Sequence, residues 1–207
     1  TEELPYHELI DEEPVVDWHP GHGPPAAAAK AGSSVRVVEY DMREYARSCV
    51  EHYLEASGEK KLRKVETPFC NAGSLPHDGD CERGALGSKA CSCLMKNFWL
   101  ARLARPDIMK AVCDLASSVT RWSRNDDRRL HRLSAYIAAT ADLTLECRVA
   151  TDTADLELSL YVDADLAGDP LTSKSTSGAY LVLTSPGGTW FPCLLYTSPS
   201  PRDDYES

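Results

Sequence analysis

The sequence predicts an α+β fold, in which a helical part is followed by an antiparallel β-meander. Two residue patterns predict this class. Apolar residues recur at helical spacing through the middle of the chain, and between Leu156 and Asp163 they alternate with polar residues. Alternation with a period of two is typical of a strand with one buried face. The change of period predicts a boundary between two units near residues 148–155.

Composition limits the function classes. The 207 residues are 43% hydrophobic and carry a formal net charge of −10. This is enough apolar material for one or two domains, but it argues against non-specific nucleic-acid binding by the molecule as a whole. Residues 101–133 are an exception, because they hold eight basic and four acidic side chains. Any contact with nucleic acid is therefore expected in this middle part.

Targeting patterns point to an intracellular chain. The sequence begins with Thr1, shows no signal-peptide pattern, and contains no apolar run of about 18 residues, the length that a membrane helix needs. We expect a cytoplasmic or nuclear protein that is not secreted and has no membrane partner. Residues 1–34, acidic and then rich in Pro, Gly and Ala, are predicted to be a linker. The eight cysteines include no CxxC pair, so ordinary thiols are favoured over a zinc site.

The first predicted helix begins at Asp41 and ends at Gly58. The carboxylate of Asp41 can cap the first turn while Glu44 reaches back to the capping amide. Apolar residues between these ends follow the i, i+3, i+4 rule, which indicates an amphipathic helix. Residues 60–69 are predicted to be extended after it, because the residue before a proline avoids the helical region.

Three further helices are predicted from a start signal followed by an apolar stripe. The start signals are Ser88, Pro106 and Asn125. The stripes consist of Cys91, Leu94, Met95, Phe98 and Trp99 in the first helix, Ile108, Val112, Leu115, Ala116 and Val119 in the second, and Leu130, Leu133 and Ile137 in the third.

Arginines gather on and just before the last of these helices. The candidate nucleic-acid contacts are Arg121, Arg124, Arg128, Arg129 and Arg132. The last three are expected on the solvent side, opposite the apolar stripe. Arginine suits phosphate geometry, but Trp122 is the one aromatic residue interleaved with the group. A solvated face and a contact with a nucleic-acid backbone therefore explain the pattern about equally well.

Carboxylates stand at the end of the alternating strand. Phosphodiester hydrolysis by two metal ions needs several carboxylates converging on the cations, and Asp163 is the candidate metal ligand and catalytic residue, with Asp165 a weaker one. Without other information, two such acids are more often turn formers. Residues 179–184 are predicted to form a second strand, and a turn at residues 186–188 leads to a third. Three strands without covering helices should expose their apolar face.

The string YVDADLAGDPLTSKSTSGAYLVL, residues 161–183, resembles the start of the ribonuclease H domain in copia-type retrotransposons. That family runs close to Y-S-D-A-D-W-A-G-D and then R-S-T-S-G. Here Leu166 replaces the usual Trp and Lys174 the usual Arg. The resemblance assigns the first metal-binding carboxylate to Asp163. It also excludes the polymerase motif Y-V-D-D, because position 164 is Ala.

Upstream landmarks extend the resemblance to about residues 39–192. They are Val65, Thr67 and Pro68 for the family's V-x-T-P, Arg105 to Ile108 for its T-R-P-D-I, and His131, Tyr136, Ile137 and Thr140 for its H-W and Y-L-x-G-T. The resemblance implies that residues 35–150 are the C-terminal, thumb- and connection-like part of a reverse transcriptase. Residues 151–192 would be the first strands of an incomplete ribonuclease H domain.

The parent implied by this resemblance is a Pol polyprotein with RNA-directed DNA polymerase and ribonuclease H activities. It would use Mg²⁺ and act on an RNA template and on RNA:DNA hybrids. The isolated chain lacks the polymerase aspartates and the later ribonuclease H carboxylates, so we expect it to be inactive and to bind no Mg²⁺ tightly. Two alternatives stay open: a binding module for nucleic acid or for a protein partner, such as the rest of Pol, and a fragment without a cellular role. Residues 193–207 resemble translated sequencing adapter and are expected to be non-native.

Overall fold

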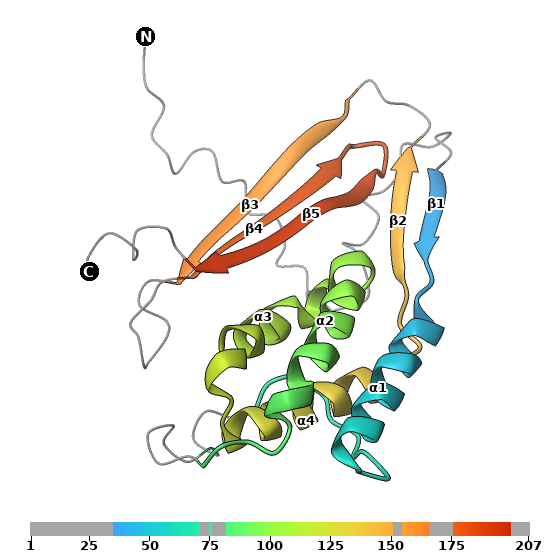
Figure 1. The fold of residues 1–207 in the computed structure, drawn as a ribbon. Coiled ribbons are helices and arrows are strands. Elements are labelled where there is room, and N and C mark those ends of the chain that lie inside the picture. Colours follow the sequence, from blue (N-terminus) through green and yellow to red (C-terminus); the bar gives the residue numbers. More distant parts are fainter. Residues whose placement is uncertain (1–34, 71–74, 76–81, 151–154, 166–175, 200–207) are drawn as a thin grey trace, which may run out of the picture.

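A computed structural model describes residues 35–70, 75, 82–150, 155–165 and 176–199 of the chain. Within these residues, four α-helices pack together and five strands form one antiparallel sheet beside them (Figure 1). The predicted α+β class is confirmed. The predicted linker, residues 1–34, lies outside the described residues.

Helix α1 spans Arg43–Ser57. The Asp41 carboxylate accepts a hydrogen bond from the Arg43 amide at 3.1 Å, but α1 has no capping box, so the predicted return bond from Glu44 is wrong. Its end is as predicted. Gly58 adopts φ 75° and its amide donates to the Leu54 carbonyl, a left-handed helix end that glycine adopts without strain.

The next two helices start differently from one another. Helix α2 spans Gly87–Leu103 and begins before Ser88 without a side-chain cap of its own, so the predicted cap is wrong. Pro106 does open a turn as predicted: the 3₁₀ helix η4, Pro106–Ile108, leads into α3, Met109–Ser117. Proline suits this position because its fixed φ fits a first turn.

Helix α4 spans Arg124–Ala139 and follows the 3₁₀ helix η5, Val119–Arg121. Its cap is Ser123 rather than the predicted Asn125. The Ser123 hydroxyl accepts from the Asp126 amide, and the Asp126 carboxylate accepts from the Ser123 amide. This capping box displaces Asn125 into the first turn, where it is buried.

The core lies between the helices. Helix α2 packs against α1 and α3, and α4 packs against α1 and α3. The largest completely buried apolar side chains include Leu94, Leu100, Ile108, Leu130, Leu133 and Ile137. Five of these six come from the predicted helical stripes, so periodicity located most of the core.

The sheet joins strands from both ends of the described chain. Its members are β1 (Val35–Tyr40), β2 (Leu145–Ala150), β3 (Glu157–Asp165), β4 (Thr176–Thr184) and β5 (Trp190–Pro199). The order is β1-β2-β5-β4-β3. Strands β3, β4 and β5 form the predicted meander, whereas β1 and β2 were not predicted. Because β2 meets β5 at the Arg148–Trp190 pair, one sheet spans the predicted boundary at residues 148–155.

The meander differs from expectation in its burial. Strand β3 lies at the edge of the sheet, and both Leu158 and its opposite-facing neighbour Tyr161 are 62% exposed. The prediction of a strand with one buried face is therefore wrong for β3, whose apolar side chains are exposed as expected for an uncovered sheet. In β4, by contrast, Val182 is buried, so the expected exposure does not hold for all three strands. Strand β5 continues to Pro199 and pairs with β4, so residues 193–199 of the expected non-native tail form part of the sheet.

Residues 60–70 form no helix or strand.

Among the described residues, no helix combines the length and the apolar character that a membrane crossing requires.

Candidate functional site

The two candidate carboxylates lie at one end of the sheet's edge strand. Asp163 of β3 pairs with Gly178 of β4, and Asp165 pairs with Thr176. The Asp163 side chain is exposed, and that of Asp165 lies outside the described part. In the described ranges, no three His, Cys, Asp or Glu side chains come together to hold a metal ion. A two-metal centre needs several converging carboxylates, and of the two candidates the structure describes only the side chain of Asp163.

The same ladder brings together both halves of the ribonuclease H-like string. The D-A-D segment, residues 163–165, lies opposite T-S-G, residues 176–178. Directly opposite residues in an antiparallel pair have neighbouring Cβ atoms. The two halves are therefore spatial as well as sequential neighbours.

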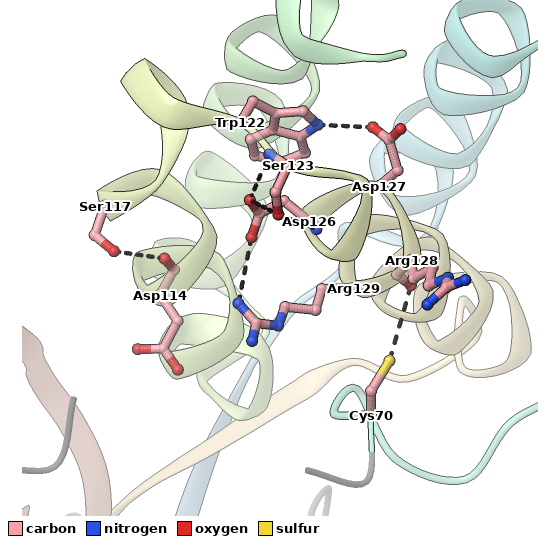
Figure 2. Close-up of polar contacts among 9 residues, drawn as sticks. All are labelled: Cys70, Asp114, Ser117, Trp122, Ser123, Asp126, Asp127, Arg128 and Arg129. Atoms are coloured by element: carbon pink, nitrogen blue, oxygen red, sulfur yellow. Dashed lines mark hydrogen bonds and ion pairs between the residues drawn. The ribbon is translucent and has the colours of Figure 1, made fainter. Parts of the chain in front are cut away.

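Two of the five candidate arginines are engaged within the protein. Arg132 donates from Nε to the Thr67 carbonyl at 2.9 Å and from Nη2 to Thr67 Oγ1 at 3.0 Å. Arg129 lies 3.3 Å from the carboxylate of Asp126 (Figure 2). Asp126 is buried, so Arg129 neutralises a charge that the fold has removed from water. Both arginines are partly exposed, with the Arg129 side chain 40% exposed, so these internal contacts restrict the side chains without burying them.

The other three arginines are exposed. Arg121 precedes α4, Arg128 lies on its outer side, and Arg124 comes within 3.6 Å of Glu82. That ion pair is weak, because both side chains are more than half exposed. A cation on this surface can exchange a weak internal partner for a phosphate. Arg121, Arg124 and Arg128 therefore remain candidates for nucleic-acid contact.

Trp122, the aromatic residue within the arginine group, is not available to stack on a base. It is 4% exposed, and its Nε1 donates to Asp127 Oδ1 at 2.7 Å (Figure 2). The same carboxylate accepts from the amides of Ala85 at 2.6 Å and Leu86 at 3.1 Å. Asp127 thus supplies, from α4, the acceptors that the start of α2 lacks.

A buried network joins two landmarks that the sequence had shown only as separate motifs. Arg105, 2% exposed, donates to both oxygens of Asp107 at 2.9 and 2.7 Å. It also donates to the carbonyl and hydroxyl of Thr140 at 3.0 and 2.7 Å. The Tyr136 hydroxyl completes the network by donating to Asp107 at 3.0 Å. Bidentate pairing of this kind satisfies a buried guanidinium, so the R-P-D-I motif fixes the end of α4.

His131 also has a structural contact. Its Nδ1 lies 3.0 Å from the Tyr53 hydroxyl of α1, and the two rings meet edge-on with centroids 5.9 Å apart. Burial raises the pKa of Tyr53 to about 12, so the phenol stays protonated at neutral pH. The pair connects α1 to α4.

The sequence analysis missed a basic run directly after α1. Lys60, Lys61, Arg63 and Lys64 are all exposed, whereas Leu62 and Val65 pack against the core. Phe69, farther along the segment, is 46% exposed. The string KKLRK, residues 60–64, was a visible signal for this run. It lies outside residues 101–133, the part of the chain in which nucleic-acid contacts were expected.

Comparisons with protein-family models, with curated proteins and with solved structures gave no match for this chain.

Proposed function

We propose that the chain is a fragment of a copia-type retrotransposon Pol polyprotein, comprising the end of a reverse transcriptase and the first strands of a ribonuclease H domain. The observation that carries this proposal is that the landmark motifs meet in space. Arg105 bonds Thr140 and Asp107 bonds Tyr136, and Thr67 bonds Arg132, the residue that follows the landmark His131 in α4. These contacts support the proposal, because motifs that belong to one domain should lie together in its fold.

The helical part would support an RNA template and an RNA:DNA hybrid in the parent enzyme, and Mg²⁺ would serve the complete ribonuclease H site. The isolated chain is proposed to lack both activities. Asp163, with Asp165 as a weaker candidate, would contribute one or two ligands, and two-metal hydrolysis needs more carboxylates than these.

The genomic locus tests the proposal of a Pol fragment. Sequencing through both ends of the reading frame should reveal an upstream Y-V-D-D. Downstream, in place of residues 193–207, it should reveal S-T-E-A-E-Y, the helix motif that carries the next family carboxylate. A genomic reading frame that encodes the present tail and then stops would contradict this origin.

An activity assay tests the proposed inactivity. The purified chain, incubated with Mg²⁺ and an RNA:DNA hybrid labelled on its RNA strand, should leave the RNA intact. RNA cleavage that disappears in Asp163→Asn would show that the chain does have a working site. Cleavage that persists in this variant would indicate a contaminating nuclease.

A second candidate function is nucleic-acid binding without catalysis. It is favoured by the exposed cations of the helical part, since Arg121, Arg124 and Arg128 all reach solvent. Binding to phosphates releases counterions, so the association constant should fall steeply as salt increases. Fluorescence anisotropy with a labelled RNA, repeated between about 50 and 200 mM salt, measures this slope. Absent or salt-insensitive binding would rule the function out.

A further inference from the structure

The segment after α1 carries the densest positive charge of the described chain. Between Glu59 and Glu66 it holds Lys60, Lys61, Arg63 and Lys64. All four side chains are exposed, and none takes part in the ion pairs found among the described residues. Four cations with no acidic partner in this part of the structure form a surface that attracts polyanions.

Contacts at both ends hold this segment in place. Leu62 and Val65 pack against the helical core, which leaves the intervening bases on the outside. The guanidinium of Arg132 binds Thr67 through two hydrogen bonds, and the Cys70 thiol donates to the Arg128 carbonyl over 3.8 Å (Figure 2). The cations are therefore presented by an anchored segment, which lowers the entropy that binding must overcome.

The arginines of α4 are less available to phosphates, because groups within the protein already contact three of them. Arg129 is paired with buried Asp126, Arg132 is bound to Thr67, and Arg124 lies near Glu82. The aromatic residues near the two surfaces also differ in their exposure. Trp122 beside α4 is buried, but Phe69 at the end of the basic segment is 46% exposed. An exposed aromatic ring in the same segment as several cations is a combination that single-stranded nucleic acid uses for stacking and phosphate contact.

We propose that the segment Lys60–Phe69, rather than the face of α4, is the primary contact for a single-stranded nucleic acid. Lys60, Lys61, Arg63 and Lys64 contact phosphates, Phe69 stacks on a base, and Arg132 is a positioning residue that holds Thr67. This assignment rests on the binding function proposed above. A membrane is a poorer partner, because Leu62 and Val65 pack against the core and Phe69 is the one large exposed apolar side chain of the segment, whereas an interfacial segment inserts an entire apolar face.

The test compares two charge-matched variants of the full chain by anisotropy with a labelled single-stranded RNA. The first replaces Lys60, Lys61 and Lys64 by Gln, and the second replaces Arg121, Arg124 and Arg128 by Gln. Each removes three charges, so a difference between them reports position rather than net charge. The first should weaken binding about tenfold or more and lower the salt slope by about 2, given about 0.7 per lost contact with a single strand. The second should weaken binding less than about threefold.

Other results overturn the assignment in distinguishable ways. Equal or greater loss in the α4 variant would place the contact on α4 while leaving the binding function intact. Absence of binding by the unmodified chain would remove both. Tighter binding to vesicles containing phosphatidylserine than to RNA would replace the nucleic acid with a lipid surface. Circular dichroism and the unfolding midpoint check that both variants fold.

Two further variants test the roles of Phe69 and Arg132. Phe69→Leu keeps an apolar side chain but removes the ring, so it should weaken RNA binding without changing the salt slope. Arg132→Lys keeps the charge but loses the two-pronged bond to Thr67. It should speed amide hydrogen exchange in residues 60–70 and weaken binding, again at unchanged slope. Full binding by Arg132→Lys would overturn the positioning role, because a charge contact alone would then suffice.

Discussion

Gly84 sits where the start of α2 meets the start of α4. Its amide donates to the Trp122 carbonyl at 3.1 Å. A Cβ atom at this position would collide with the Ser123 carbonyl oxygen and would lie 2.6 Å from Trp122 Cδ1. We expect Gly84→Ala to lower the free energy of unfolding by about 2 to 3 kcal/mol, since overpacking forces the backbone apart.

Urea unfolding measures the effect of Gly84→Ala, and Gly87→Ala is its control. A Cβ at Gly87 would make only ordinary contact with Trp122, 3.4 Å away, and alanine has the higher helix propensity. The control should stay within about 1 kcal/mol of the unmodified chain. Equal stability of the two variants would mean that the close approach at Gly84 is wrong.

Asp127 joins three donors with one carboxylate. It accepts from the amides of Ala85 and Leu86 and from Trp122 Nε1. Asp127→Ala should lower the free energy of unfolding by about 2 to 4 kcal/mol, because the donors of the buried residues Leu86 and Trp122 lose their acceptor. Asp114→Ala is the control, since its ion pair with Lys110 is about half exposed and should cost no more than about 0.5 kcal/mol. Denaturant midpoints that move equally would contradict this role of Asp127.

The helix ends show which contacts can be inferred from sequence. Gly58 was predicted correctly because a C-terminal glycine acts through its own backbone. The contact that Asp127 makes with the amides before α2 was not predicted. Asp127 lies 42 positions from Ala85, and no local pattern connects the two residues. Ser123 was missed in favour of Asn125 although both are good capping residues. Its partner Asp126 was the signal that could have decided between them.

The buried face of α2 shows a second limit of pattern reading. The predicted stripe included Met95 and Trp99, but these are 50% and 52% exposed. The residues that face the neighbouring helices include the small Ala90, Cys93 and Ala101. Small side chains allow helix axes to approach closely, whereas ranking positions by hydrophobicity favours the largest side chains. Helix existence was therefore predictable, but the face it buries depended on the neighbours.

The connection between η4 and α4 depends on Arg105. The Arg105 side chain is 3% exposed, and the side chain of its partner, Asp107, is 14% exposed. Arg105→Met should lower the free energy of unfolding by about 3 to 5 kcal/mol, since it leaves a largely buried carboxylate without its cation. The loss should be visible as a shift of the urea midpoint and as earlier proteolysis at the end of α4.

Arg43→Met is the control for Arg105, because the Arg43–Asp41 pair is nearly half exposed on both sides. It should leave the urea midpoint almost unchanged, because exposed ion pairs contribute little to stability. A comparable cost in both variants would mean that Arg105 contributes only as a surface cation. The motif R-P-D-I would then need a different explanation from the buried network with Thr140.

The candidate functional residues were only partly predictable for a related reason. Sequence located five arginines, but it could not show that Arg129 and Arg132 are engaged by Asp126 and Thr67. It also gave no weight to the cations after α1, because their exposure follows from the way Leu62 and Val65 pack. Charge can be counted in a sequence, whereas availability is a property of the fold.

The sheet contains both strands that local sequence predicts and strands that it does not. The meander β3–β4–β5 was predictable because its strands are consecutive in the sequence. A recognisable turn joins β4 to β5, and in it Gly188 adopts φ 99°. Strands β1 and β2 pair Val35 with Ala150, across the entire helical part. Such non-local pairing has no local signal and must overcome loop-closure entropy. A prediction of two separate units followed directly from missing this pair.

Cysteine reactivity tests this architecture because five of the described thiols lie in α1, α2, β2 and β5. Cys49, Cys93 and Cys147 are buried, and Cys91 and Cys193 are exposed. Burial raises the pKa of Cys49 and of Cys147 to about 11, which further lowers the thiolate population at neutral pH. In the native protein, a maleimide reagent should therefore modify Cys91 and Cys193 well before the three buried thiols.

Peptide mass spectrometry at timed intervals measures this order at pH 7. In urea all five thiols should react at similar rates, which serves as the control for intrinsic reactivity. Cys147 is the most informative position, since its protection requires β2 to be covered in the sheet. If Cys147 reacts as fast as Cys193 while Cys49 stays protected, the helical cluster would stand but the pairing of β2 within the five-stranded sheet would be wrong. Uniform protection of Cys49, Cys93 and Cys147 would support one cooperative structure in which β1 and β2 bind the meander to the helices.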